Sequence, residues 1–315
     1  MSYKRLDPED IVVSAESIAA PAWTGNTVTL SSLNSSSTQR QNTSGEFYLN
    51  IYDKVVTDDS SEVQFAIAYG NSKGSGSTAF NTAVAGNSPS STVYKQARTQ
   101  LLGTEESLFK INNTDAESIY VISLNRSRYK EKLLPGSLTI KISGSQFTDD
   151  SPNTTVDSFS DTGRVYNLVS GSAGNPRTEK YGLVYPDAGI IIVSSSLAPE
   201  TDKGSSVANG NNNDYFKAVL EEGGAEFTIR SEETVTSNYV FIRARNSEFN
   251  YSTNPSYITG SGELRHSTLI DNPQAYISTV GLYNDNNELL AVAKVSRPLL
   301  KDFTKEALLR VKLDY

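Results

Sequence analysis

Large apolar residues alternate with polar or smaller ones in several short segments of this 315-residue chain. The alternation runs from Phe47 to Ile51, again from Val63 to Tyr69, and it returns from Leu309 to Tyr315. A period of two residues places successive side chains on opposite faces of a β-strand. Further strand-like segments separated by polar turns are found at 119–124, 138–142, 165–169, 183–193, 227–230 and 239–245. The sequence therefore predicts a mainly β fold with mostly antiparallel, sandwich-like sheets.

Helical signals are few and short. Ser88–Pro89 is a typical helix start, Tyr94, Ala97 and Leu101 then share one face, and Gly103 is a typical helix end. These residues predict a helix near 89–102. A second short helix is predicted near 214–222, where apolar residues recur at helical spacing before two glycines.

The C-terminal region carries the clearest hairpin signal. Segments 277–283 and 288–295 are rich in apolar residues and flank the turn-forming residues Asn284–Asn287. We expect a hairpin there, with its pairing broken at Arg297–Pro298. A last strand then runs to the C-terminus.

The composition of the chain divides it into three parts. Residues 1–45 read as an extended N-terminal arm or linker, because Trp23 lies among turn-forming residues and 31–44 is almost wholly small and polar. Without a periodic apolar face, this arm is expected to lie across the body or a neighbour; a mobile tail without a partner is the alternative. A β-rich domain is predicted over 46–200 and a β-rich C-terminal part over 201–315.

The inventory of reactive residues is poor. The chain has no cysteine and a single histidine, His266, which no nucleophile or zinc-binding motif accompanies. The clusters Asp58–Asp59, Asp149–Asp150 and Asn284–Asn287 favour turns over Ca²⁺ binding, because they lack the spacing of a calcium loop. We therefore predict no catalytic, cofactor-binding or metal-binding residue, and no enzymatic activity.

Charge and hydropathy restrict the partners. A net charge of −8 and a pI near 4.9 argue against nucleic-acid binding, which requires a basic surface. The longest apolar runs fall far short of the roughly 20 residues of a membrane helix, so no membrane insertion is expected. The N-terminal residues lack the apolar core of a signal peptide, which favours synthesis in the cytoplasm.

One local pattern suggests a contact surface. Arg126, Arg128, Lys130 and Lys132 occupy every second position, so an extended backbone would place their charges on one face. Such a basic stripe could dock against an acidic neighbour through pairing of its guanidinium groups with carboxylates. The alternative is a solvated strand end. Together with Trp23 of the arm, these four residues are the candidate interaction residues.

Several segments resemble the virion structural proteins of T4-like cyanophages. The first is Arg126–Leu133, which continues to Pro135–Gly136 and a strand. The other similar segments are Tyr69–Gly70 with the Gly/Ser-rich loop that follows, 181–189, 249–255, 280–285 and 289–294. The resemblance implies a β-rich building block of a tailed-phage virion, most plausibly of its tail or baseplate, and carries over no catalytic residue.

The expected function is accordingly that of a structural subunit acting through assembly contacts. Its partners would be other tail or baseplate proteins and copies of itself, and its location the virion. Three alternatives stay open: a receptor-binding or carbohydrate-binding adhesin module, a neck or head-associated structural protein, and a hydrolase working through paired carboxylates.

Overall fold

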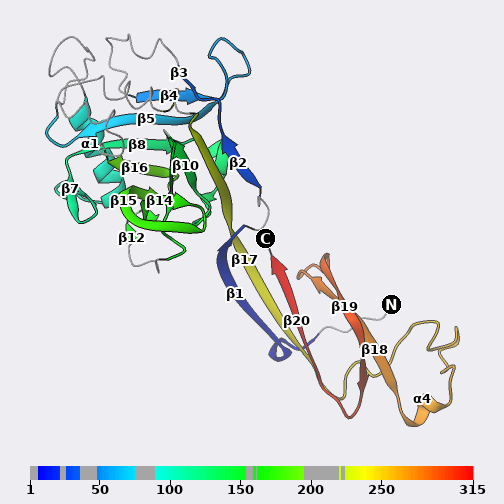
Figure 1. The fold of residues 1–315 in the computed structure, drawn as a ribbon. Helices are drawn as coiled ribbons and strands as arrows, with labels where there is room; N and C mark the ends of the chain where they lie inside the picture. Colours follow the sequence, from blue (N-terminus) through cyan, green and yellow to red (C-terminus); the bar gives the residue numbers. More distant parts are fainter. Residues whose placement is uncertain are drawn as a thin grey trace. The chain divides into compact units, whose positions relative to one another are not determined.

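The computed structural model describes residues 6–21, 26–35, 48–74, 89–142, 144–153, 159–160, 162–194, 220 and 224–314. Strands account for 55% and helices for 10% of the structure, and the sheets are antiparallel. The predicted mainly β fold with a few short helices is therefore confirmed (Figure 1).

The chain forms two compact units. Unit 1 combines Met1–Ile18 with Val235–Tyr315, and unit 2 is Ala19–Thr234. The sequence had suggested divisions near residues 45 and 200. The units divide elsewhere because strand β1 (Ile11–Ala20) pairs with strand β17 (Glu226–Ala244), which brings the beginning of the chain into the C-terminal unit.

A short 3-10 helix, Pro8–Asp10, precedes β1. The strands of unit 2 and their bounds are β2 (Thr27–Leu30), β3 (Asn34–Ser35), β4 (Tyr48–Tyr52), β5 (Val63–Asn71), β6 (Phe109–Ile111), β7 (Thr114–Ala116), β8 (Ser118–Leu124), β9 (Lys132–Leu133), β10 (Thr139–Ile142), β11 (Ser145–Asp149), β12 (Phe159–Ser160), β13 (Gly163–Arg164), β14 (Tyr166–Ser172), β15 (Asn175–Tyr185) and β16 (Ile190–Ser194). Its main sheet follows the order β17-β10-β11-β14-β15-β16-β8-β5-β4-β3, and β2 and β9 also pair with β17. Two small hairpins, β6–β7 and β12–β13, lie outside this path.

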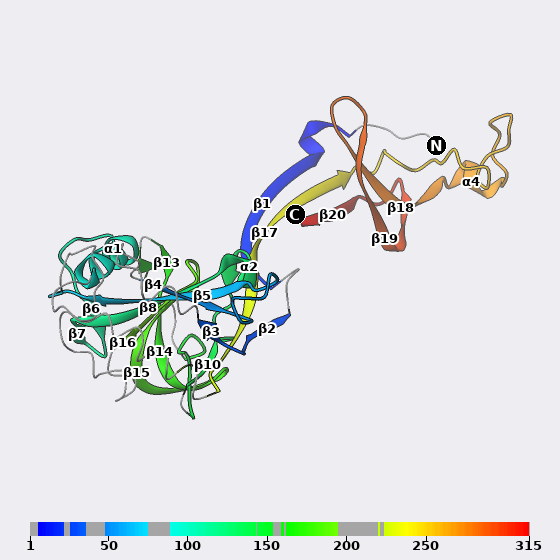
Figure 2. The same ribbon diagram turned by 90° about the horizontal axis from the view of Figure 1, so that it is seen from above.

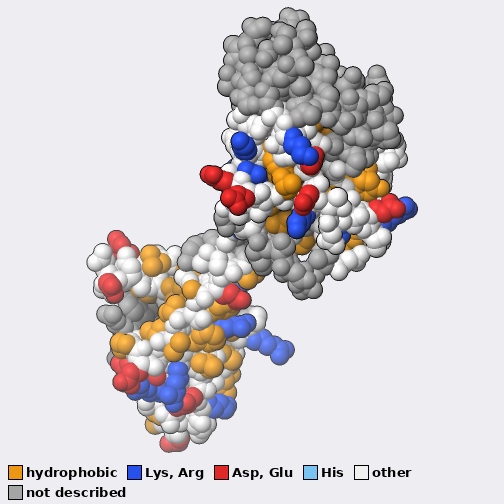
Figure 3. All heavy atoms as spheres, turned by 90° about the vertical axis from the view of Figure 1, so that its left-hand side faces the viewer, with side chains coloured by type: hydrophobic (Ala, Val, Ile, Leu, Met, Phe, Trp, Pro, Cys, Tyr) orange, Lys and Arg blue, Asp and Glu red, His pale blue; other side chains and the backbone are white. Residues whose placement is uncertain are grey.

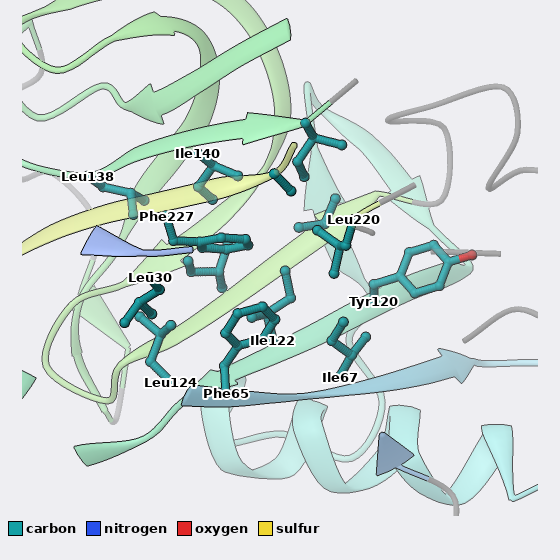
Figure 4. Packing of buried hydrophobic residues seen from close by; sticks show 14 of the residues in the cluster. Leu30, Phe65, Ile67, Tyr120, Ile122, Leu124, Leu138, Ile140, Leu220 and Phe227 are labelled. Atoms are coloured by element: carbon teal, nitrogen blue, oxygen red, sulfur yellow. The ribbon is translucent and has the colours of Figure 1, made fainter. Parts of the chain in front are cut away.

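The main sheet of unit 2 curls around its core. Phe65 on β5 and Phe227 on β17 lie far apart along the strand order, yet their ring centroids are 4.7 Å apart. Both rings belong to one buried cluster that also contains Leu30 of β2 and Ile122 of β8 (Figure 4). Opposed parts of a single sheet thus enclose the core, as two sheets do in a sandwich.

Most predicted strands of this unit are present, but two segments differ. Residues 183–193 were expected as one strand and instead form the end of β15, a turn and β16, with Gly189 at φ +67° in the turn. Conversely, 227–230 and 239–245 were expected as two strands and belong to the single 19-residue strand β17. Alternation marks strand residues but does not show where a chain turns.

The helix predicted near 89–102 is confirmed as α1 (Ser90–Leu102), which ends at Gly103 with φ +64°. Tyr94, Ala97 and Leu101 are buried on its inner face. The Tyr94 hydroxyl donates to the Ala116 carbonyl at 2.7 Å and accepts from the Phe109 amide at 3.2 Å, which fixes the β6–β7 hairpin against the helix. The second predicted helix, near 214–222, lies outside the described residues except for Leu220.

In unit 1, the second half of β17 pairs with β1 and with β20 (Ala307–Asp314), in register from Ser237↔Asp314 to Ala244↔Ala307. The predicted C-terminal strand is thereby confirmed. A further short helix, α4, spans Thr268–Asp271.

The predicted hairpin of unit 1 is also confirmed. It consists of β18 (Gln274–Tyr283) and β19 (Leu289–Asp302), seen as a two-stranded ribbon in Figure 2. The expected end of pairing at Arg297–Pro298 is wrong, because pairing is only interrupted over 295–298 and resumes at Ile277↔Leu299. Proline removes one amide donor, and the register shift accommodates that loss.

Candidate interaction surface

The two units differ sharply in how much apolar surface they bury. Among the described residues, 35 of the 39 buried hydrophobic side chains lie in unit 2. Unit 1 contributes only Val235, Ile242, Ala244 and Val311. Because burial of apolar surface is the main driving force of folding, unit 1 has little core of its own.

Exposed hydrophobic side chains show the reverse distribution. In the part of the chain that the structure describes, fourteen of the 17 large hydrophobic side chains that are exposed lie in unit 1. They are Ile11, Val12, Val13, Ile18, Tyr251, Ile270, Tyr276, Tyr283, Leu289, Leu290, Val292, Leu299, Phe303 and Leu308. Figure 3 shows hydrophobic side chains gathered over much of one face of this unit.

The size of this apolar surface can be compared with known interfaces. With roughly 150–250 Å² of surface for a large apolar side chain, half-exposure of fourteen such groups leaves on the order of 1,000 Å² in contact with water. The largest apolar patch on a typical monomer is about 300–600 Å², and a standard interface buries about 800 Å² on each partner. Summed over unit 1, the exposed apolar surface is therefore as large as the area that one partner buries in a standard interface.

The β18–β19 hairpin is apolar on both faces. On β19, Ala291, Ala293 and Val295 occupy one parity and are half-buried, while Leu290 and Val292 occupy the other and are 68% and 58% exposed. A sheet that is apolar on both faces is normally covered on both. A free two-stranded hairpin is at best marginally stable in water, so this hairpin needs cover that the described residues of its own chain do not provide.

The N-terminal arm is extended, as predicted, and its described part lies on its own chain. Strand β2 pairs with β17 and buries Leu30, and β3 pairs with β4. Strand β1 differs, because the consecutive residues Ile11, Val12 and Val13 are all exposed although they point to alternate faces. Trp23 lies outside the described residues, so its predicted contact role stays a prediction.

The predicted basic stripe does not have the extended conformation that would align its charges. Arg126–Tyr129 forms the one-turn helix α2, and Lys130 follows with φ +62° and ψ −95°. The Asn125 side chain accepts a hydrogen bond from the Ser127 amide at 3.1 Å and caps this turn. Burial of Tyr129 anchors the turn against Gly189. The alternating charges therefore point in different directions.

Two cationic side chains of the basic stripe make hydrogen bonds or ion pairs within the chain itself. Arg126 donates to the carbonyl oxygens of Lys130 and Glu131, at 3.0 and 2.9 Å, and so fastens the end of α2. Arg128 lies 2.8 Å from the Glu62 carboxylate and 3.8 Å from that of Asp53. Lys130 is exposed and Lys132 is half-buried at the start of β9.

The best-enclosed charges in unit 2 form a structural clamp. Arg164 lies 2.7 Å from Asp187 and also contacts the buried carboxylate of Glu232 on β17. Burial opposes the charge of the guanidinium, but the hydrogen bonds that it donates to both carboxylates outweigh this effect and raise the pKa of Arg164. Burial likewise opposes ionisation of Asp187, and the hydrogen bonds from Arg164 hold its pKa below the usual value. Both carboxylates are thus committed to one cation.

The Asp and Asn clusters serve as turn residues, as predicted. Asp58 accepts from the amide and hydroxyl of Ser60, at 2.8 and 2.6 Å, and these bonds lower its pKa. Asn284 accepts from the Glu288 amide at 2.8 Å across the β18–β19 turn. Such contacts are what Asx turns use.

Other site types find little support in the described part of the chain. A pocket of about 360 Å³ in unit 2 is lined by ten residues, of which Arg230 is the only charged one, so it holds no carboxylate pair. Among the described residues, no group of three or more His, Cys, Asp or Glu side chains is placed to hold a metal ion. His266 is exposed. No described helix combines the length and the apolar content needed to cross a bilayer.

Comparison with known proteins gave no match to any protein family, curated protein or solved structure.

Proposed function

We propose that the chain is a structural subunit of a tailed-phage virion, in its tail or baseplate, and that unit 1 makes its assembly contacts. The observation that carries the assembly role is the distribution of apolar surface: unit 1 buries four hydrophobic side chains and exposes fourteen large ones. The virion setting rests on the resemblance of segments such as 126–133 and 181–189 to cyanophage virion proteins.

The two units would contribute differently to this role. Unit 2 has two buried hydrophobic clusters and a paired ion cluster, so it can hold its own fold. Unit 1 keeps its strands paired, but Leu290 and Val292 on one face of β19 and Ile11, Val12 and Val13 of β1 are exposed. Surfaces of this kind mark sites of protein–protein contact.

A structural role also agrees with the state of the charged groups. Arg128, Arg164 and Arg245 each pair with carboxylates of their own chain. Carboxylates used in this way stabilise loops and strand ends rather than stand ready as an acid–base pair.

The experiment that tests the assembly role replaces exposed apolar residues of the hairpin in the full-length chain. Leu290→Lys places a charge on the exposed face of β19, and Val55→Lys places one on an equally apolar, exposed position of unit 2. Particles assembled with each variant are purified, and the amount of this chain in them is measured. We expect Leu290→Lys to be lost from particles and Val55→Lys to be retained.

Two results would contradict the proposal. Normal incorporation of Leu290→Lys would refute the role of unit 1 in assembly. Absence of the wild-type chain from purified particles would refute the virion setting, and its location at the neck or head in particle images would refute the tail or baseplate.

A second candidate, the carbohydrate-binding adhesin, has one observation in its favour. Tyr251 is exposed and packs edge-on against Tyr257, with ring centroids 5.5 Å apart. Aromatic faces of this kind can stack on sugar rings. Glycan-array binding that is abolished by Tyr251→Ala would favour this function over assembly.

A further inference from the structure

The free edge of strand β18 lacks the usual protection against pairing. Among the described strands, β18 pairs only with β19, so its second edge carries no neighbouring strand. Natural edge strands normally carry a lysine, a proline or an inward-pointing charge that prevents further pairing. In this hairpin Lys294, Arg297 and Pro298 all lie on β19, and the ten residues of β18 include no charge and no proline.

The composition of β18 favours pairing as well. Its sequence is rich in β-branched and aromatic residues, among them Tyr276, Ile277, Thr279, Val280 and Tyr283. An uncharged segment of this type without proline readily adds a further strand. The edge of β18 that does not pair with β19 can therefore accept another strand.

We propose that β18 pairs in antiparallel orientation with β18 of a second copy of this chain, across a two-fold axis. The proposal rests on the assembly role proposed above and names one partner for it. The product is a continuous four-stranded sheet in the order β19-β18-β18-β19, which passes the three-strand threshold for independent stability.

The absence of charge is what favours a second copy over an unrelated strand. In a two-fold interface residue i contacts residue j, and residue j contacts residue i. Any charged residue near the axis would then face its own counterpart, and like charges opposite one another destabilise a strand pair. Strand β18 meets this condition along its whole length.

The register that places Thr279 on the two-fold axis overlaps nine of the ten residues and gives acceptable neighbours. A two-fold axis normal to the sheet keeps each side chain on its own face, so one residue must lie opposite its own copy. Large residues mostly meet smaller or β-branched ones. The facing pairs are Thr279–Thr279, Ser278–Val280, Ile277–Gly281, Tyr276–Leu282 and Ala275–Tyr283.

The distribution of net charge permits the approach of two copies through unit 1. Unit 1 contains 11 Lys and Arg against 12 Asp and Glu, whereas unit 2 contains 17 against 24. Unit 1 is thus nearly neutral, and unit 2 holds most of the net charge of −8. Of the exposed large hydrophobic side chains described in unit 1, Tyr276 and Tyr283 lie on β18 itself.

The test uses the full-length chain and light scattering coupled to size-exclusion chromatography. We expect the wild type to be a dimer at micromolar concentrations. Thr279→Lys places two lysines beside the axis and should raise the dimer dissociation constant at least tenfold, with an unchanged circular dichroism spectrum. The matched control Val292→Lys introduces the same charge at an exposed position of β19 and should leave the dimer intact.

A covalent variant keeps the proposal testable if Thr279→Lys does not fold. The chain has no cysteine, so Thr279→Cys introduces the only thiol. In the stated register this thiol faces its own counterpart on the second copy, and mild oxidation should yield a covalent dimer. Ser278→Cys should yield none, because its two copies are diagonal neighbours about 7–8 Å apart, whereas a disulfide requires a Cβ separation of about 3.5–4.5 Å.

The outcomes separate this inference from the proposed function. A monomeric or trimeric wild type, or a dimer that Val292→Lys disrupts and Thr279→Lys does not, would overturn the pairing of β18. A dimer that forms no covalent product in the Thr279→Cys variant would also overturn it. If the chain is monomeric and Leu290→Lys is still lost from particles, self-pairing fails while the assembly role stands.

Discussion

Phe227 is the residue at which the curled sheet of unit 2 can be tested most directly. Its side chain is fully buried, and its ring lies 4.7 Å from that of Phe65 across the core. We expect Phe227→Ala to lower the free energy of unfolding of unit 2 markedly. The fold of the described strands should persist, because the backbone pairing of β17 does not depend on this ring.

The magnitude follows from the burial. Truncation of a buried phenylalanine to alanine costs about 3–5 kcal/mol, through lost apolar burial and the cavity that remains. Loss of the ring contact adds about 0.5–1.5 kcal/mol. The upper half of the first range, about 4–5 kcal/mol, is expected because Phe227 is completely enclosed. For a unit of this size that corresponds to a fall in Tm of roughly 10–20 °C.

Urea unfolding followed by circular dichroism measures the effect, with Phe303→Ala as the matched control. Phe303 is a phenylalanine of unit 1 that is 54% exposed, and its truncation should change the free energy of unfolding by less than about 0.5 kcal/mol. A double-mutant cycle with Phe65→Ala should show coupling of about 0.5–3 kcal/mol. Equal effects of Phe227→Ala and Phe303→Ala would refute the curled sheet and its enclosed core.

Three further predictions concern buried charges. Arg164→Met should destabilise unit 2 by about 3–5 kcal/mol in urea unfolding, because Asp187 and Glu232 lose their shared cation; no loss would show that the clamp is solvated. Since the pKa of Asp187 is lower in the folded than in the unfolded chain, its stabilisation is present above pH 4 and is lost as the pH falls through the folded pKa. Asp187→Asn should reduce the fall in the free energy of unfolding at acid pH. A pH dependence of stability equal to that of the wild type would contradict this role of Asp187. Lys301 is fully buried and donates hydrogen bonds to Asn250 and to two carbonyl oxygens. Lys301→Met should therefore destabilise unit 1 by about 1–3 kcal/mol in thermal unfolding. A more stable variant would contradict this role of Lys301.

Local patterns were sufficient to predict most individual elements. Alternation located β5, β8, β10 and β20, and the polar residues 284–287 located the β18–β19 turn. Helix α1 followed from its apolar spacing and Gly103. Each of these signals depends on neighbours in sequence, where backbone geometry and turn chemistry act directly.

The candidate site residues depended on tertiary structure, and prediction there was less successful. Arg126 to Lys132 alternate in charge, but the Asn125 cap and the buried Tyr129 turn this segment into a helical turn. Strand β17 looked like two strands because its middle residues are polar; Glu232, among them, pairs with Arg164 of a distant strand. A partner far away in sequence leaves no local signal.

The apolar hairpin of unit 1 shows both kinds of information together. The sequence by itself determined that 274–283 is uncharged and that both faces of 289–293 are apolar, because a period of two assigns each residue to a face. Only the tertiary structure decided that the face of Leu290 and Val292 stays exposed while unit 2 encloses its own core. Burial depends on which surfaces the whole chain brings together, and no local pattern contains that information.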